Sequence, residues 1–178
     1  ALNLLLRRGR RYPLERARRL VQHLQRLDWQ HLVITGDLTQ LGLAEEFALA
    51  REVLAPLLER GPEHVTVLPG NHDRYVAEPA GQGAFEAHFA RFAPPAAGQP
   101  LLTRRLGAHW RLVAWDSAQP APWHSAAGRV RPETLAATTA WLAGLPAGAP
   151  VIVANHYPVF FPPPHRHKPS HDLANQDE

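Results

Sequence analysis

Residues 31–37 read His-Leu-Val-Ile-Thr-Gly-Asp, and residues 64–73 read His-Val-Thr-Val-Leu-Pro-Gly-Asn-His-Asp. In both stretches a short, continuous apolar run ends abruptly in glycine and polar residues. Such runs are typical of β-strands that are buried on both faces of a parallel sheet. Residues 151–156 repeat the pattern as Val-Ile-Val-Ala-Asn-His. These three stretches predict central strands of the fold.

Helical patterns separate the predicted strands. Apolar residues recur there at spacings of three and four positions, which predicts amphipathic helices. Pro56 falls inside the second helix and predicts a kink or its last turns, and Pro132 is expected at the first position of the last helix. The predicted helices cover residues 14–27, 47–58, 132–145 and a short segment around 85–92, and a β-hairpin covers 101–115. Strands that alternate with helices are typical of an α/β protein.

The composition is that of one folded domain, which we expect to span residues 1–178 with a loop over 161–178. Of the 178 residues, 45% are hydrophobic and 20% charged, enough for one core. There is no cysteine, which excludes disulfides, thiolate metal sites and thiol catalysis. No apolar run reaches the roughly 18 residues that a membrane-spanning helix needs. The net charge of +3 is too small to argue for nucleic-acid binding without a located basic patch.

Metal-competent side chains follow three of the predicted strands directly. These are Asp37, Asn71 and His156, each at the carboxyl end of its strand. Ligands of open α/β sheets bind beyond these ends, so the three side chains are expected to converge. Carboxylate, amide oxygen and imidazole are ligands that suit manganese, iron or zinc. The alternative for each residue is ordinary turn chemistry, but three such residues in one chain favour a site.

The amino-acid sequences of these segments resemble the signatures of a known family. Residues 34–39 (Ile-Thr-Gly-Asp-Leu-Thr), 68–73 (Leu-Pro-Gly-Asn-His-Asp) and 155–158 (Asn-His-Tyr-Pro) are similar to the second, third and fourth signatures of calcineurin-like metallophosphoesterases. The first two are most similar to those of the class III cyclic-nucleotide phosphodiesterase branch. The resemblance spans about residues 12–160. It implies an α/β fold in which two sheets are layered between helices, an α/β/β/α sandwich.

The resemblance also implies roles for single residues. Asp37 would bridge two metal ions (manganese, iron or zinc), and Asn71 and His156 would complete part of the second ion's shell. His72 would act near the leaving oxygen as general acid or phosphate-orienting group, and Asp73 would hold the ring of His72. The implied reaction is hydrolysis of a phosphodiester or phosphomonoester by a metal-bridging hydroxide. The implied substrate is a small-molecule phosphate ester, with cyclic nucleotides among the candidates.

Two further signatures of that family, Asp-x-His and Gly-His-x-His, do not occur in this sequence. Every internal signature is retained, both terminal ones are missing, and the sequence does not begin with methionine. We therefore interpret the chain as an internal fragment of a longer enzyme, with a fold incomplete at both ends and weak or no activity on its own. The alternative is a non-catalytic module that binds phosphate groups or a partner through a degenerate metal site.

Other polar features are given simpler interpretations. The basic run from Arg7 to Arg11 is interpreted as a solvated surface, the alternative being peripheral contact with a phosphate or membrane surface. Nucleic acid is not an expected partner. The His-rich segment 165–171 is expected to be a polar loop, with a lid over the phosphate as the alternative. Asp116 is interpreted as a residue whose side chain only stabilises a turn after a strand. The absence of cysteine is compatible with the cytoplasm, where we expect the protein.

Overall fold

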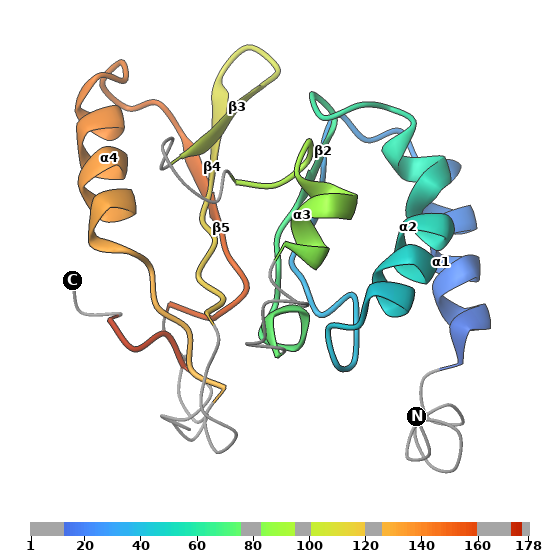
Figure 1. Ribbon diagram of the computed structural model, residues 1–178. Coiled ribbons are helices and arrows are strands. Elements are labelled where there is room, and N and C mark those ends of the chain that lie inside the picture. The colour runs from blue at the N-terminus through green and yellow to red at the C-terminus, as the bar shows by residue number, and fades with distance from the viewer. Residues whose placement is uncertain (1–12, 76–82, 95–100, 120–125, 160–171, 176–178) are drawn as a thin grey trace, which may run out of the picture.

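The computed structural model describes residues 13–75, 83–94, 101–119, 126–159 and 172–175 (Figure 1). In chain order the elements are α1 (Leu14–Gln25), β1 (Leu32–Ile34), α2 (Ala44–Leu58), β2 (Val65–Val67), the 3-10 turn η2 (His72–Arg74), α3 (Ala84–Phe89), β3 (Leu102–Leu106), β4 (Trp110–Ala114), α4 (Pro132–Ala143) and β5 (Val151–Ala154). The predicted helices and strands are therefore present, and most of them are shorter than expected.

The strands of the described residues form two sheets. β1 and β2 pair in parallel, with Ile34 opposite Val67. In the second sheet β4 is central: it pairs antiparallel with β3, as the predicted hairpin, and in parallel with β5, where Ala114 lies opposite Ala154. Parallel pairing brings the carboxyl ends of the paired strands to one edge of each sheet.

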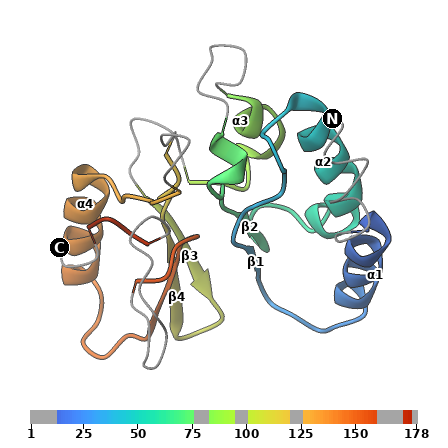
Figure 2. The same cartoon turned by 90° about the horizontal axis from the view of Figure 1, so that it is seen from below.

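Helices cover the outer faces of the two sheets. α1 and α2 lie on the outer side of the β1–β2 sheet, and the β3–β4–β5 sheet lies between β1–β2 and α4 (Figures 1 and 2). The predicted mixed α/β fold with two sheets layered between helices is confirmed. None of the described helices is long and apolar enough to span a membrane.

Two apolar clusters hold the layers together. The first joins α2, α3 and the β1–β2 sheet through Phe47, Phe85, Phe89, Val65 and Val67, all at most 1% exposed. The second lies between the two sheets and contains Leu68, Leu102, Leu112, Ala114 and Ala154. Burial of apolar area is the main favourable term of folding, so these clusters fix how the strand ends meet.

Two expectations about single elements are refined. Pro56 lies in the last turn of α2, whose C-cap is Glu59, so it ends the helix rather than kinking it midway. Burial on both faces holds for β2 but is wrong for β5, where Ile152 and Val153 are 40% and 44% exposed. The reason is packing: the valines of β2 lie in the cluster with the phenylalanines of α2 and α3, whereas Ile152 and Val153 belong to none of the buried clusters of the described residues.

Candidate metal centre

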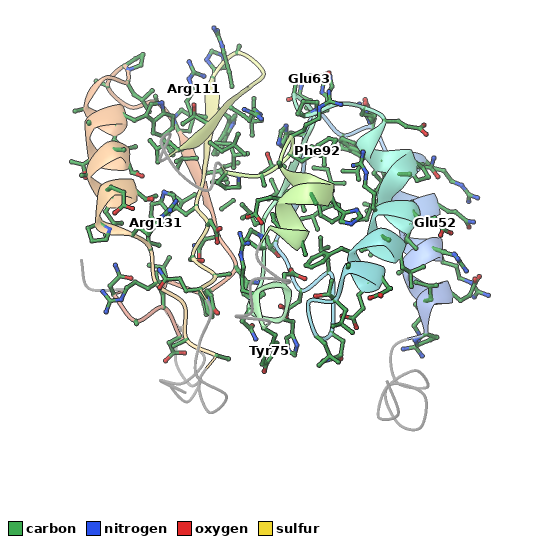
Figure 3. The ribbon with its side chains drawn as sticks, in the orientation of Figure 1. Glu52, Glu63, Tyr75, Phe92, Arg111 and Arg131 are labelled. Carbon is green, nitrogen blue, oxygen red and sulfur yellow. The ribbon has the colours of Figure 1, made fainter. Side chains whose placement is uncertain are left out.

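The turns after β1, β2 and β5 bring Asp37, Asn71 and His156 together. The ring of His156 reaches the first sheet: its Nε2 lies 3.2 Å from Asn71 Oδ1 and 3.5 Å from Asp37 Oδ1. The site lies toward the end of the molecule marked by Tyr75 in Figure 3, because the Tyr75 ring lies 4.9 Å from the ring of His72. Glu63 and Arg111 mark the opposite end (Figure 3). The predicted convergence of the three residues is therefore present.

The orientation of His156 is set by a backbone carbonyl. Its Nδ1 lies 2.6 Å from the oxygen of Thr35, which can only accept, so the ring proton is on Nδ1. The lone pair of Nε2 is then left facing Asn71 Oδ1 and Asp37 Oδ1. Ligand atoms about 2.0–2.2 Å from one ion lie roughly 3 Å from one another in tetrahedral or octahedral shells. The two distances from His156 Nε2 and the chemistry of the three side chains fit a divalent cation.

The backbone around Asp37 is shaped for close approach. Gly36 has φ +102° and Asp37 itself has φ +58°, a left-handed conformation that few non-glycine residues adopt. Gly70 faces Asp37 from the next turn, and a Cβ on Gly70 would overlap both the backbone nitrogen and Oδ1 of Asp37. His72 donates its backbone N–H to the same Oδ1 over 3.2 Å. The carboxylate is thus held against the turn that carries Asn71 and His72.

Asp73 ties the two turns to each other. Oδ1 accepts the backbone N–H and the hydroxyl of Thr39, both at 2.9 Å. Oδ2 accepts the N–H of Gly70 at 2.8 Å and that of Leu38 at 3.2 Å. Burial raises the pKa of the Asp73 carboxyl above its ordinary value, while the donors from Gly70, Thr39 and Leu38 oppose that shift. Its role is to hold the turn after β1 against the turn after β2.

The ring of His72 has a different partner from the one expected. Nδ1 lies 2.8 Å from the backbone carbonyl oxygen of Gln40, which can only accept, and 3.3 Å from the side-chain Nε2 of the same residue; the shorter contact favours the proton on Nδ1. Within the part of the chain that the structure describes, no hydrogen bond joins the carboxylate of Asp73 to this ring. The expectation that Asp73 holds the ring was therefore wrong, because the N–H groups of two turns occupy its oxygens. Gln40 carries no motif signal that could have identified it.

Asn155 and Tyr157, the residues on either side of His156, form one wall of the site. Asn155 Oδ1 accepts the N–H of Tyr157 at 2.9 Å, which shapes the turn around His156. The Tyr157 ring stands edge-on to His156 at 5.0 Å and is 4% exposed. Burial raises the pKa of its hydroxyl, and the charges of Asp37 and Asp116 add to the shift. This hydroxyl has no hydrogen-bond partner among the described residues.

Within the described ranges no group of three or more His, Cys, Asp and Glu side chains is placed to hold a metal. The candidate centre is consistent with this, because its third ligand is the amide of Asn71. The basic run from Arg7 to Arg11 and the segment 165–171 lie outside the described residues, so their expected roles remain predictions. Asp116 does make the expected turn contact, accepting the N–H of Ala118 at 3.1 Å, but it also pairs with Arg74.

Comparison with known proteins gives one clear match. A search of curated proteins finds none that matches the chain. The sequence model of the calcineurin-like phosphoesterases, by contrast, matches residues 11–176 and so covers nearly all of the chain. That match includes all three strand-end turns and the elements that carry them. The chain belongs to the calcineurin-like phosphoesterase family, whose members are metal-dependent phosphoesterases.

Proposed function

We propose that this protein hydrolyses phosphodiester or phosphomonoester bonds of small molecules with the help of two metal ions (manganese, iron or zinc), and that cyclic nucleotides are the first substrates to test. The observation that carries the proposal is that Asn71 Oδ1 and Asp37 Oδ1 both lie within 3.5 Å of His156 Nε2. Turn chemistry alone gives no reason for side chains that follow strands of two separate sheets to meet.

Asp37, Asn71 and His156 would hold one ion. Oδ2 of Asp37 receives no hydrogen bond from the described residues, and the side chain is 40% exposed, so this oxygen is available to a second ion. When bound, such a pair of ions lowers the pKa of a water molecule and stabilises negative charge on the phosphate oxygens. A second ion needs ligands beyond the three that the described residues bring together.

His72 would supply the proton at the leaving oxygen or orient the phosphate. With Nδ1 engaged by Gln40, Nε2 is the atom left to face a substrate, and no described residue bonds to it. Asp73 contributes indirectly by holding the turn that carries Asn71 and His72. A general acid of this kind contributes about 10²–10⁴-fold to a rate.

The test is metal-dependent hydrolysis by the intact protein, including any sequence that flanks these residues in its gene. After chelation and reloading with Mn²⁺, the protein is assayed with bis-p-nitrophenyl phosphate, p-nitrophenyl phosphate and 2′,3′- and 3′,5′-cyclic AMP. Asp37→Ala should lower turnover at least about 100-fold, because it removes the shared ligand. Asp28→Ala, an exposed aspartate before β1, is the matched control and should leave turnover unchanged.

Unchanged turnover in Asp37→Ala would contradict the proposal. Wild-type protein that binds phosphate but hydrolyses none of these esters with Mn²⁺, Fe²⁺ or Zn²⁺ would favour a non-catalytic binding module instead. Two equivalents of tightly bound metal per chain would support the shared-carboxylate arrangement, and one equivalent would contradict it.

A further inference from the structure

The candidate ligands come from two halves of the molecule, and no strand pairing joins these halves within the residues that the structure describes. Asp37 and Asn71 belong to the N-terminal half, the described residues from 13 to 94, which carries β1 and β2. His156 belongs to the C-terminal half, the described residues from 101 to 175, which carries the other sheet. The position of one ligand relative to the other two therefore depends on side-chain contacts between the halves.

A partly buried ion-pair cluster joins the halves next to the candidate centre. Arg74 Nη2 lies 2.8 Å from Asp116 Oδ2 and 2.6 Å from Glu86 Oε1, and Nη1 lies 3.0 Å from Glu86 Oε2. Only 17% of the Arg74 side chain and 14% of the Asp116 side chain are exposed. Apart from the contact of His156 with Asp37, this is the ion pair that joins the halves within the described residues.

Both ends of the Arg74–Asp116 pair are close in sequence to candidate ligands. Arg74 ends η2, three residues after Asn71. Asp116 stands two residues beyond Ala114, and His156 two residues beyond Ala154, which is the partner of Ala114 in the sheet. Asp116 and His156 therefore leave neighbouring strands at equivalent positions.

Each member of the cluster is itself held in place. The guanidinium of Arg74 lies 5.2 Å from the ring centre of Phe85 in α3, and Glu86 follows Phe85 on the same helix. Asp116 Oδ1 accepts the N–H of Ala118, which fixes the carboxylate. The planar guanidinium binds Glu86 through two nitrogens and Asp116 through one of them, in a fixed fork geometry that the freely rotating ammonium of a lysine does not impose. These contacts hold the turn after β2 at a fixed place relative to the turn after β4.

We propose that Arg74 and Asp116 are positioning residues, which set the place of His156 relative to Asp37 and Asn71 and so complete the metal centre. The inference rests on the proposed function, because the position of His156 matters only if the three residues bind metal. The position itself can be measured without metal. A merely stabilising role would make the two ion pairs of Arg74 equivalent. A positioning role makes them different, because only the pair with Asp116 crosses between the halves.

The experiment compares Asp116→Asn with Glu86→Gln in the intact protein. Each variant removes one charge that pairs with Arg74, but Glu86 lies in the same half as Arg74. The first readout is the ¹H–¹³C signal of the His156 ring in metal-free protein, assigned with His156→Gln. The second is the affinity for Mn²⁺, measured from the free-ion EPR signal. The third is the unfolding midpoint in urea.

We expect Asp116→Asn to shift the His156 ring signal and weaken Mn²⁺ binding about tenfold, in the range seen for residues that orient metal ligands. Glu86→Gln should leave the ring signal in place and change the Mn²⁺ affinity less than about twofold. This should hold even if its unfolding midpoint in urea falls by as much as that of Asp116→Asn. An unaltered ring signal in Asp116→Asn, or equal changes in both variants, would overturn the proposal.

A triple variant guards against a folding defect in Asp116→Asn. Arg74→Gln combined with Glu86→Gln and Asp116→Asn leaves no unpaired buried charge, which is the main cost of breaking such a cluster. It should show the same ring shift and the same loss of affinity as Asp116→Asn. Wild-type protein that binds no Mn²⁺ would contradict the proposed function alone, since the ring signal is measured without metal and still decides the positioning role.

Discussion

At Gly70 the backbone of one turn passes so close to Asp37 that no side chain fits between them. A Cβ there would overlap Asp37 and would lie 2.8 Å from Cε1 of His156. Gly70→Ala should therefore push the two ligands apart and weaken Mn²⁺ binding at least about tenfold, because displacements below 1 Å already disturb such sites. Titration with Mn²⁺ monitored by EPR measures the effect.

The matched control for Gly70→Ala is Gly144→Ala. Gly144, the C-cap of α4, has a negative φ, and a Cβ there would meet only the carbonyl oxygens of Trp141 at 3.5 Å and Ala140 at 3.9 Å. Its Mn²⁺ affinity should equal that of the wild type. If Gly70→Ala also bound Mn²⁺ with the affinity of the wild type, the close packing around Asp37 would not be needed for metal binding.

His31 should make the stability of the folded chain sensitive to pH. Its Nδ1 faces the carbonyl of Glu63 at 3.1 Å, so the ring donates there, and Nε2 accepts the hydroxyl of Thr66 at 2.9 Å. Burial lowers the pKa of His31 below its ordinary value of 6.5, the carbonyl of Glu63 opposes this, and the charges of Arg104 and His64 lower it further. Since the unfolded chain then binds the proton more readily, the free energy of unfolding should fall as pH drops through 6.5.

His31→Gln keeps a donor and an acceptor but removes the titrating group. The difference in unfolding free energy between pH 8 and pH 5.5, measured with urea, should be smaller in this variant than in the wild type. His23→Gln, at an exposed position of α1, serves as control and should behave as the wild type. Equal pH dependence in His31→Gln and wild type would refute the assignment.

The buried hydroxyl of Thr138 links α4 to Trp115, the residue that follows β4. Thr138 Oγ1 accepts the indole N–H of Trp115 at 3.0 Å and donates to the carbonyl of Thr134 at 2.8 Å. Thr138→Val leaves the indole donor unpaired inside the protein, which costs about 1–3 kcal/mol of unfolding free energy. Urea denaturation measures this loss.

Thr139→Val is the matched control on the same helix. Thr139 also bonds to the carbonyl four residues earlier, that of Leu135, but it is exposed. Its replacement should change the free energy of unfolding by less than about 0.5 kcal/mol. Similar losses in both variants would mean that the Trp115–Thr138 bond does not hold the helix to the sheet.

For the whole molecule, metal binding and folding should be coupled. The centre draws Asp37 and Asn71 from one sheet and His156 from beyond the other, so the unfolded chain cannot reproduce it. A ligand that binds only the folded state stabilises it by about 2.7 kcal/mol at 100 times its dissociation constant. Mn²⁺ should accordingly raise the thermal midpoint of the metal-free protein, and EDTA should reverse the rise.

Asp37→Ala should lose this thermal shift, whereas Asp28→Ala should keep it. Differential scanning fluorimetry over a range of Mn²⁺ concentrations is sufficient for the comparison. A rise of the same size in Asp37→Ala would place the bound metal elsewhere in the molecule.

Much of this protein can be predicted from its sequence because the deciding patterns are local. The apolar runs at 31–35 and 64–68 form strands, Pro56 and Pro132 lie at the ends of their helices, and residues 102–114 form the expected hairpin. Glycine and polar residues that directly follow a strand must lie at its carboxyl end, so the neighbourhood of Asp37 and Asn71 follows from the parallel pairing of β1 with β2, whereas the approach of His156 from the other sheet does not.

Only the tertiary structure decided which hydrogen-bond and ion-pair partners these residues have. Asp73 holds two turns instead of the ring of His72, the Gln40 carbonyl orients that ring, and Asp116 pairs with Arg74 across the two halves. β5 is exposed although its sequence is as apolar as that of β2. Hydrogen bonds and ion pairs between distant segments depend on where each donor and acceptor lies after packing, and no pattern of neighbouring residues encodes that geometry.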